Sequence, residues 1–144
     1  MSRKLAETLY TEALILADEM RAYFDAHGRA ERDELHPHGR VQFACESLKA
    51  TTRLMHVIAW LATRRAIDAG ELAEGDPASP ERALAESPPS DTAVLGDMPT
   101  AARQLILGGI DLHERVGRLA SGMAEAVTQA SPARALIQRL ERAF

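Results

Sequence analysis

The chain has 144 residues, of which 46% are hydrophobic and 26% are charged, and its formal net charge is -4. This mixture is typical of one folded domain rather than of a disordered chain. Its acidity argues against a protein that mainly binds nucleic acid, because phosphate neutralisation needs clustered Lys and Arg. With a single cysteine, no internal disulfide, and no apolar run long enough to span a membrane, we expect one cytoplasmic domain over residues 1–144.

The first predicted helix covers residues 3–27. Its apolar side chains recur at spacings of three and four, which places them on one stripe: Leu5, Leu9, Ala13, Leu16, Met20, Tyr23 and Phe24. Gly28 then predicts the end of this helix, because glycine tolerates the left-handed conformation of a C-cap. A polar and charged segment leads from there to Pro37.

The second predicted helix covers residues 37–69, with Pro37 in its first turn and Gly70 after its end. One seam along it is made of Val41, Cys45, Leu48, Thr52, Met55, Ala59 and Ala62. A second face is made of Leu54, Val57, Trp60 and Leu61. A helix with two such faces needs two neighbours, and we expect Cys45 to be a small buried hydrophobe in the first seam.

Residues 70–98 differ in character from the rest of the chain, with four prolines and seven acids against one arginine. This composition predicts a mobile acidic linker, with at most a brief helix capped by Ser79 and begun by Pro80. Residues 35–69 are instead basic, with five Lys or Arg against two acids. Arg64 and Arg65 could bind an acidic partner or fold back on the linker, although a solvated face is the simpler interpretation.

A third helix is predicted over residues 99–129, opened by Pro99 and carrying two interleaved apolar seams. Gly108 and Gly109 weaken it by about 1 kcal/mol each relative to alanine, which favours the close approach of another helix. Ser131 and Pro132 are typical of a cap and a first turn. They predict a short C-terminal helix over residues 132–143, with a stripe of Leu136, Ile137, Leu140 and Phe144.

These elements predict an all-α fold: an elongated antiparallel three-helix bundle in up-down-up order, with the acidic, proline-rich linker 70–98 before the third helix and a short helix at the C-terminus. Helices two and three have more apolar surface than such a thin bundle buries, so we expect a symmetric homodimer. The candidate residues for a partner or dimer interface are Arg53, Leu54, Val57, Trp60, Leu61, Arg64, Arg65, Leu136, Leu140 and Phe144.

The sequence holds no recognisable catalytic or metal-binding constellation. The Glu-x-x-His pair of di-iron bundles is missing, and its nearest relation, Asp33-x-x-His36, lies at a charged helix start. His36 and His38 are interpreted as solvated, whereas His56 and His113 fit core or interface positions, and a pH-sensitive contact of His113 stays open. Neither a phosphate loop nor a nucleophile elbow occurs. We therefore predict no enzymatic activity, no cofactor and no metal.

One block of the second helix resembles a known family. Glu46-Ser47, the run TTRLM at residues 51–55, Trp60-Leu61, Arg65-Ala66 and the run GEL at residues 70–72 look like the central block of the regulator of CtrA degradation family, the RcdA-like proteins of alphaproteobacteria. The third helix, around LILGGIDLHERVGRL, is similar more loosely. The resemblance implies a non-catalytic dimeric adaptor that helps to deliver cell-cycle regulators to the ClpXP protease, with ClpX or a response-regulator-like protein as partner.

Two other classes of function stay open beside the adaptor. A general helical scaffold would use the C-terminal apolar stripe to dock in a groove on its partner, without any role in proteolysis. An enzyme or metal protein is disfavoured because the residues that such chemistry needs are missing from the sequence.

Overall fold

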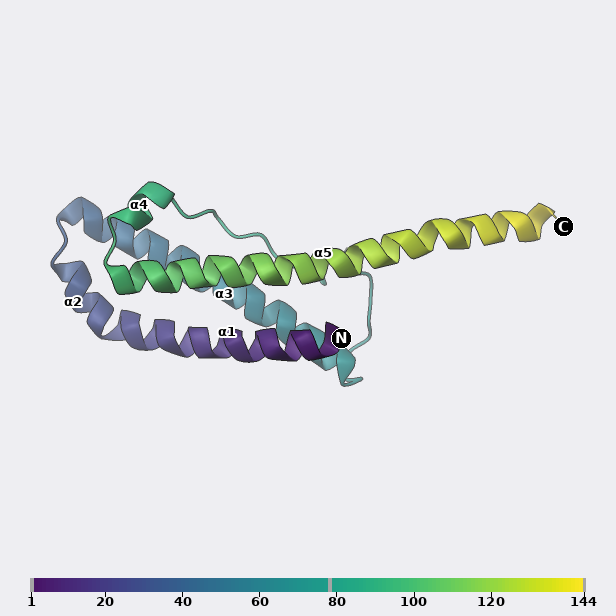
Figure 1. Ribbon diagram of the computed structural model, residues 1–144, viewed down its shortest axis with the longest axis horizontal. Coiled ribbons are helices and arrows are strands. Elements are labelled where there is room, and N and C mark those ends of the chain that lie inside the picture. Colours follow the sequence, from purple (N-terminus) through teal and green to yellow (C-terminus); the bar gives the residue numbers. More distant parts are fainter. Residues whose placement is uncertain (1, 78, 144) are drawn as a thin grey trace.

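The computed structural model describes residues 2–77 and 79–143, and these residues form an all-α fold. Its elements are α1 (Ser2–Asp25), α2 (His27–Asp33), α3 (Pro37–Asp68), α4 (Thr92–Gly96) and α5 (Thr100–Ala143). The three long helices α1, α3 and α5 pack side by side, while the short helices α2 and α4 are both found at the same end of the bundle (Figure 1). The C-terminal half of α5 continues far beyond the body.

The order of the helices differs from the predicted up-down-up arrangement. Arg65 of α3 pairs with Glu7 at the start of α1, and Arg115 of α5 pairs with Glu12, so both helices run antiparallel to α1. Helices α3 and α5 therefore run in the same direction (Figure 1). The physical reason is the length of the connection, since residues 69–99 carry the chain back along the bundle before α5 begins.

The core lies where the three long helices meet. α1 contributes Ala6, Leu9, Ala13 and Met20; α3 contributes Phe43, Ala50, Leu54, Val57 and Leu61; α5 contributes Ala102, Ile106, Leu112 and Val116. Leu95 of α4 and the following Met98 are buried with them. The predicted stripe of α1 thus faces the core at most of its positions, although Leu5 is exposed.

The start of α3 follows the sequence closely. Pro37 is in its first turn, where its missing N–H leaves no helical hydrogen bond unmade. His36 is the N-cap, and its Nδ1 accepts a hydrogen bond from the backbone N–H of Gly39 at 3.1 Å. The histidine beside Pro37 is thereby explained as a capping residue.

Gly28 has a different role from the predicted helix end. α1 ends at Asp25, and Gly28 lies buried inside the short helix α2. A Cβ atom at this position would lie 2.9 Å from the carbonyl oxygen of Tyr23. Glycine is therefore required here by close packing and not by a left-handed conformation.

The glycine pair of α5 does not mark a close approach of another helix, so that prediction is wrong. A Cβ atom on Gly109 would meet nothing within 4 Å, and one on Gly108 would only touch Leu16 at 3.8 Å.

The predicted separate helix over residues 132–143 is also not observed, because α5 runs without a break from Thr100 to Ala143. Pro132 lacks the N–H of one helical hydrogen bond, at a typical cost of about 3 kcal/mol in a helix interior. Alanine is frequent on both sides of it, as in the run QASPARA, and alanine is the strongest helix former. The helical preference of the flanking sequence thus outweighs the local signal of a cap.

Residues 79–91 are the largest departure from the prediction, because a series of hydrogen bonds joins them to the bundle, which the composition of a linker does not predict. The expected brief helix at Ser79 is only a turn, in which the carbonyl of Ser79 accepts from the N–H groups of Arg82 and Ala83. The chain then continues in an extended form to Asp91, which caps α4 through hydrogen bonds to Ala93 and Val94. We call residues 79–91 the strap.

Candidate docking surfaces

Five polar and aromatic side chains form a column on α3 that faces the strap. They are Glu46, Lys49, Arg53, His56 and Trp60. Their spacings of three and four residues place them on one side of the helix, beside the core face and separate from it. We call this column the α3 track, because each of its members hydrogen-bonds to the strap.

The track holds the strap mainly by its backbone carbonyl groups. Arg53 donates to the carbonyl of Pro88 at 3.0 Å, Lys49 to that of Pro89 at 3.3 Å, and the indole N–H of Trp60 to that of Arg82 at 2.9 Å. The strap runs in the opposite direction to α3, because its last residues lie beside the start of the track. Hydrogen bonds to backbone carbonyl groups require the strap to be extended, but they depend little on which side chains the strap carries.

Two histidines, one from α3 and one from α5, contact the middle of the strap. His56 of α3 lies 2.9 Å from the hydroxyl of Ser87, measured from its Nδ1. His113 of α5 donates from Nε2 to the carbonyl oxygen of Ala85 at 3.2 Å. Both histidines act here as hydrogen-bonding partners of the connecting segment.

A carboxylate and a guanidinium are buried under the end of the strap. Glu46 is 2% exposed and Arg53 is 4% exposed. Burial by itself would raise the pKa of Glu46, but hydrogen bonds from Ser90, the Asp91 N–H and Lys49 outweigh it, and the pKa lies below its usual value. Burial lowers the pKa of Arg53, against the opposing charge of Glu46. The negative charge of Glu46 and the positive charge of Arg53 therefore stabilise each other at a site that water hardly reaches.

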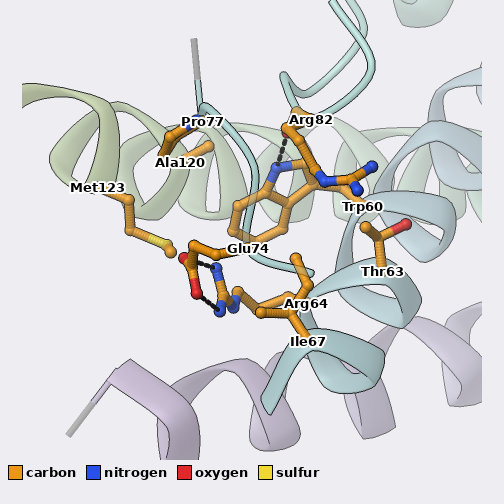
Figure 2. Close-up of a pocket in the computed structure, with 9 residues that line it drawn as sticks. All are labelled: Trp60, Thr63, Arg64, Ile67, Glu74, Pro77, Arg82, Ala120 and Met123. Atoms are coloured by element: carbon orange, nitrogen blue, oxygen red, sulfur yellow. Dashed lines mark hydrogen bonds and ion pairs between the residues drawn. The ribbon is translucent and has the colours of Figure 1, made fainter. Parts of the chain in front are cut away.

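Arg64 closes the other end of the track. Its guanidinium donates to both carboxylate oxygens of Glu74, at 2.9 and 3.1 Å, and to Asp68 at 3.1 Å. The hydrogen bond to Glu74 is the main reason that the pKa of Arg64 is raised and that of Glu74 is lowered. Figure 2 shows this pair beside Trp60, in a small hollow that Met123 of α5 borders. Arg64 therefore folds back onto the linker, and the simpler interpretation of a solvated face is wrong for this residue, since its side chain is only 12% exposed.

Arg65 lies outside this hollow and ties α3 to α1. Its Nε donates to Glu7 at 3.0 Å, and its guanidinium lies 4.4 Å from the centre of the Tyr10 ring. This arrangement combines an exposed ion pair with a cation–π contact, so it contributes modestly to the packing of the two helices.

The first predicted seam of α3 is exposed. Val41 is 60% exposed, Leu48 is 69% and Met55 is 64%, and Cys45 is also exposed, contrary to the expectation that it is buried. These residues lie on the side of α3 that faces away from the core. We call Val41, Cys45, Leu48 and Met55 the bare stripe.

An apolar groove adjoins the bare stripe between α1 and α3. It is bordered by Ala17, Met20, Phe24, Leu54, Met55 and Ile58, with Arg21, Asp25 and Thr51 at its polar edge. The groove and the stripe share Met55, so they form one continuous apolar surface.

The candidate interface residues predicted from the sequence fall into three places. Leu54, Val57 and Leu61 lie in the core, where they hold α3 against its neighbours. Arg53, Trp60 and Arg64 are engaged by the strap or by Glu74, while Arg65 contacts α1. Leu136 and Leu140 are exposed on the part of α5 that projects beyond the bundle, together with Ile137 (Figure 1). Phe144 lies outside the described residues.

Sequence reasoning missed Glu46, Lys49 and His56 as members of the track. The signal that would reveal them is their common spacing with Arg53 and Trp60, which makes a third, polar face on a helix that is otherwise apolar.

Within residues 2–77 and 79–143, no group of three or more His, Cys, Asp and Glu side chains is arranged to hold a metal ion. Over the same part of the chain, every helix is too short or too polar to cross a membrane.

The chain is similar to a described family and to a solved structure. A family model described as "Protein of unknown function (DUF1465)" matches residues 1–144. The crystal structure of RcdA from Caulobacter crescentus CB15 is 31% identical in sequence, with a TM-score of 0.68, and the match covers 83% of this chain and 90% of that chain. None of the curated proteins compared with the chain matches it. The likeness to RcdA thus extends to sequence as well as to fold.

Proposed function

Because this chain belongs to the DUF1465 family of RcdA-like proteins, we propose that it is a non-catalytic adaptor that helps to deliver cell-cycle regulators to the ClpXP protease. The observation that carries the proposal is the likeness to RcdA over most of both chains. The adaptor works in the cytoplasm, by docking surfaces and without a cofactor. One of its partners is ClpX or a response-regulator-like protein, and another is the protein to be degraded.

The bare stripe supports the docking part of this proposal. Val41, Leu48 and Met55 expose large apolar side chains along one face of α3, and such a contiguous surface is typical of an interaction site. We assign this face to a second copy of the chain, in a homodimer whose two α3 helices pack through the same residues. A two-fold symmetric contact needs only one self-complementary patch, which the stripe provides.

Reconstituted proteolysis tests the adaptor role. Purified ClpXP should degrade a cell-cycle regulator faster when the protein is added, and the protein should bind ClpX or the response-regulator-like component directly. Changing Leu48 and Met55 to Glu should reduce the acceleration, whereas Leu107→Glu, at an exposed position of α5, serves as the control. Absence of both acceleration and binding would refute the adaptor role.

The projecting part of α5 favours a second candidate function, that of a helical scaffold unrelated to proteolysis. Leu136, Ile137 and Leu140 are each more than half exposed and lie within two turns of one helix. An amphipathic helix of this kind fits a hydrophobic groove on another protein. Deletion of residues 131–144 separates the two candidates, because the scaffold loses its partner while an adaptor that works through α3 retains its effect on degradation.

A further inference from the structure

The strap is held as a bound extended peptide would be held. Its carbonyl groups at Arg82, Ala85, Pro88 and Pro89 accept hydrogen bonds from side chains of α3 and α5. Ser87 and Ser90 also hydrogen-bond to the track through their own side chains. The donors are thus arranged to recognise the backbone of an extended chain rather than one sequence.

Few apolar contacts hold the strap itself. Leu84 is half-buried, and its Cδ2 would lie 3.9 Å from a Cβ atom on Gly117, so that the glycine of α5 leaves room for it. The fully buried residues that follow, Leu95 and Met98, lie beyond the strap, in and after α4. The strap is therefore attached chiefly by polar contacts, which water can replace.

Displacement of the strap would cost Glu46 its hydrogen bonds from Ser90 and Asp91, but it would also bring water to two polar atoms. Oε2 of Glu46 and Nη1 of Arg53 are buried without a hydrogen-bond partner among the described residues. Buried polar atoms of this kind are unfavourable, and the penalty is removed once water reaches them. Displacing the strap would therefore leave a track of solvated donors on a bundle whose apolar core stays closed.

We propose that the α3 track is a docking groove for an extended, acidic, proline-containing segment of a partner protein, and that the strap is its built-in competitor. The cations Lys49 and Arg53 outnumber the single carboxylate of Glu46 in the groove, and the strap supplies three exposed acids of its own, Glu81, Glu86 and Asp91. The Pro88-Pro89 pair keeps the strap extended where the track holds it. This inference rests on the proposed docking role and names the groove and the type of segment that it receives.

The intramolecular strap competes at a high effective concentration, because it is covalently attached on both sides. A free peptide of the same sequence should therefore bind the wild-type chain poorly. It should bind well when the strap is loosened by Leu84→Ser, since Leu84 belongs to the strap and not to the track.

The test uses a fluorescent peptide with the sequence of residues 79–91, SPERALAESPPSD, and the full-length protein. Fluorescence anisotropy should show at least tenfold tighter binding to Leu84→Ser than to the wild type. Adding Trp60→Phe or Lys49→Met to Leu84→Ser should weaken binding severalfold, because each removes one donor to a carbonyl. A control peptide with its acids replaced by lysine should bind at least tenfold more weakly.

Equal binding to the wild type and to Leu84→Ser, absence of binding to both, or indifference to Trp60→Phe and Lys49→Met would overturn the proposal. Hydrogen exchange gives a second measurement that needs no variant. The N–H of Asp91, which donates to Glu46 at 3.2 Å, should exchange at least tenfold faster than that of Val57 in the core. Equal protection would also overturn it. Because neither measurement involves a protease or its substrate, failure here leaves the adaptor role to its own test.

Discussion

Two faces of α3 lie outside the core, and only one of them is covered by another part of the chain. The face that holds Glu46, Arg53 and Trp60 is covered by the strap, although two of these side chains carry charge. The face that holds Leu48 and Met55 is left exposed, although it is apolar. The comparison teaches that the path of the chain, and not hydropathy alone, decides which face is covered within one molecule. What the chain leaves bare is available to another molecule.

The largest effect is expected from breaking the buried charge pair on the covered face. Arg53→Ala removes the donor to the carbonyl of Pro88 and leaves the buried carboxylate of Glu46 without the nearby positive charge of the guanidinium, so it should lower the free energy of unfolding by about 3 kcal/mol or more. Urea denaturation measures the change. Met55→Ala, two residues further along α3 on the bare stripe, should change it by less than about 0.5 kcal/mol. Similar losses for both variants would abolish the distinction between the two faces.

The bare stripe is expected to matter for association rather than for folding. Leu48→Glu combined with Met55→Glu should raise the dissociation constant of the proposed dimer at least tenfold, or about 1.4 kcal/mol, because it places four like charges in a two-fold contact. Analytical ultracentrifugation measures the constant, and Leu107→Glu on α5 is the control. A wild-type chain that stays monomeric at high concentration would contradict the assignment of this face.

A smaller change is expected when one donor of the track is removed. Trp60→Phe keeps an aromatic ring but loses the N–H that donates to the carbonyl of Arg82, so unfolding should become easier by about 1 kcal/mol. The neighbouring exposed residue provides the matched control, Ala59→Ser, for which we expect almost no change in a urea titration. If the two variants behave alike, the indole contributes nothing to holding the strap.

The last expected effect concerns how the stability of the folded chain declines in acid. The pKa of Glu46 is lowered in the folded chain from its ordinary 4.5, so its contribution to stability is present above pH 4.5 and is lost as the pH falls through the lower folded value. Glu46→Gln should therefore show a weaker decline in the free energy of unfolding below pH 4.5 than the wild type. Urea titrations over a pH series measure both profiles, and superimposable profiles would rule out this role.

Local signals in the sequence were sufficient for the long helices. Pro37 begins α3 because its ring and missing N–H suit the first turn, and the spacing of Leu54, Val57 and Leu61 matches their burial. These features depend on residues close together in the chain, which is why periodicity finds them. Pro132 shows the limit of the same approach, since a local cap signal was overridden by the helical preference around it.

The strap could not be predicted from composition, because its order depends on contacts between residues far apart in sequence. Pro88 and Arg53 are separated by 35 positions, and Glu46 and Asp91 by 45. The resemblance to RcdA-like proteins included Glu46, Arg53 and Trp60, but sequence alone gave no reason for them. The structure supplies that reason, since all three residues anchor the strap. Cys45 and its apolar neighbours were assigned to the core only because nothing in their spacing distinguishes a buried seam from an exposed one.

The unbroken continuation of α5 determines the distance between two partner molecules that bind at different places on this protein. Met123 borders the hollow beside Trp60, and at about 1.5 Å per residue Leu140 lies about 25 Å further along the same rod. A flexible tail would let whatever is bound to Leu140 swing back over the body, but a helix fixes its reach and direction. Partner molecules bound near Leu140 of α5 and on the side of α3 would therefore be held at a constant distance from each other.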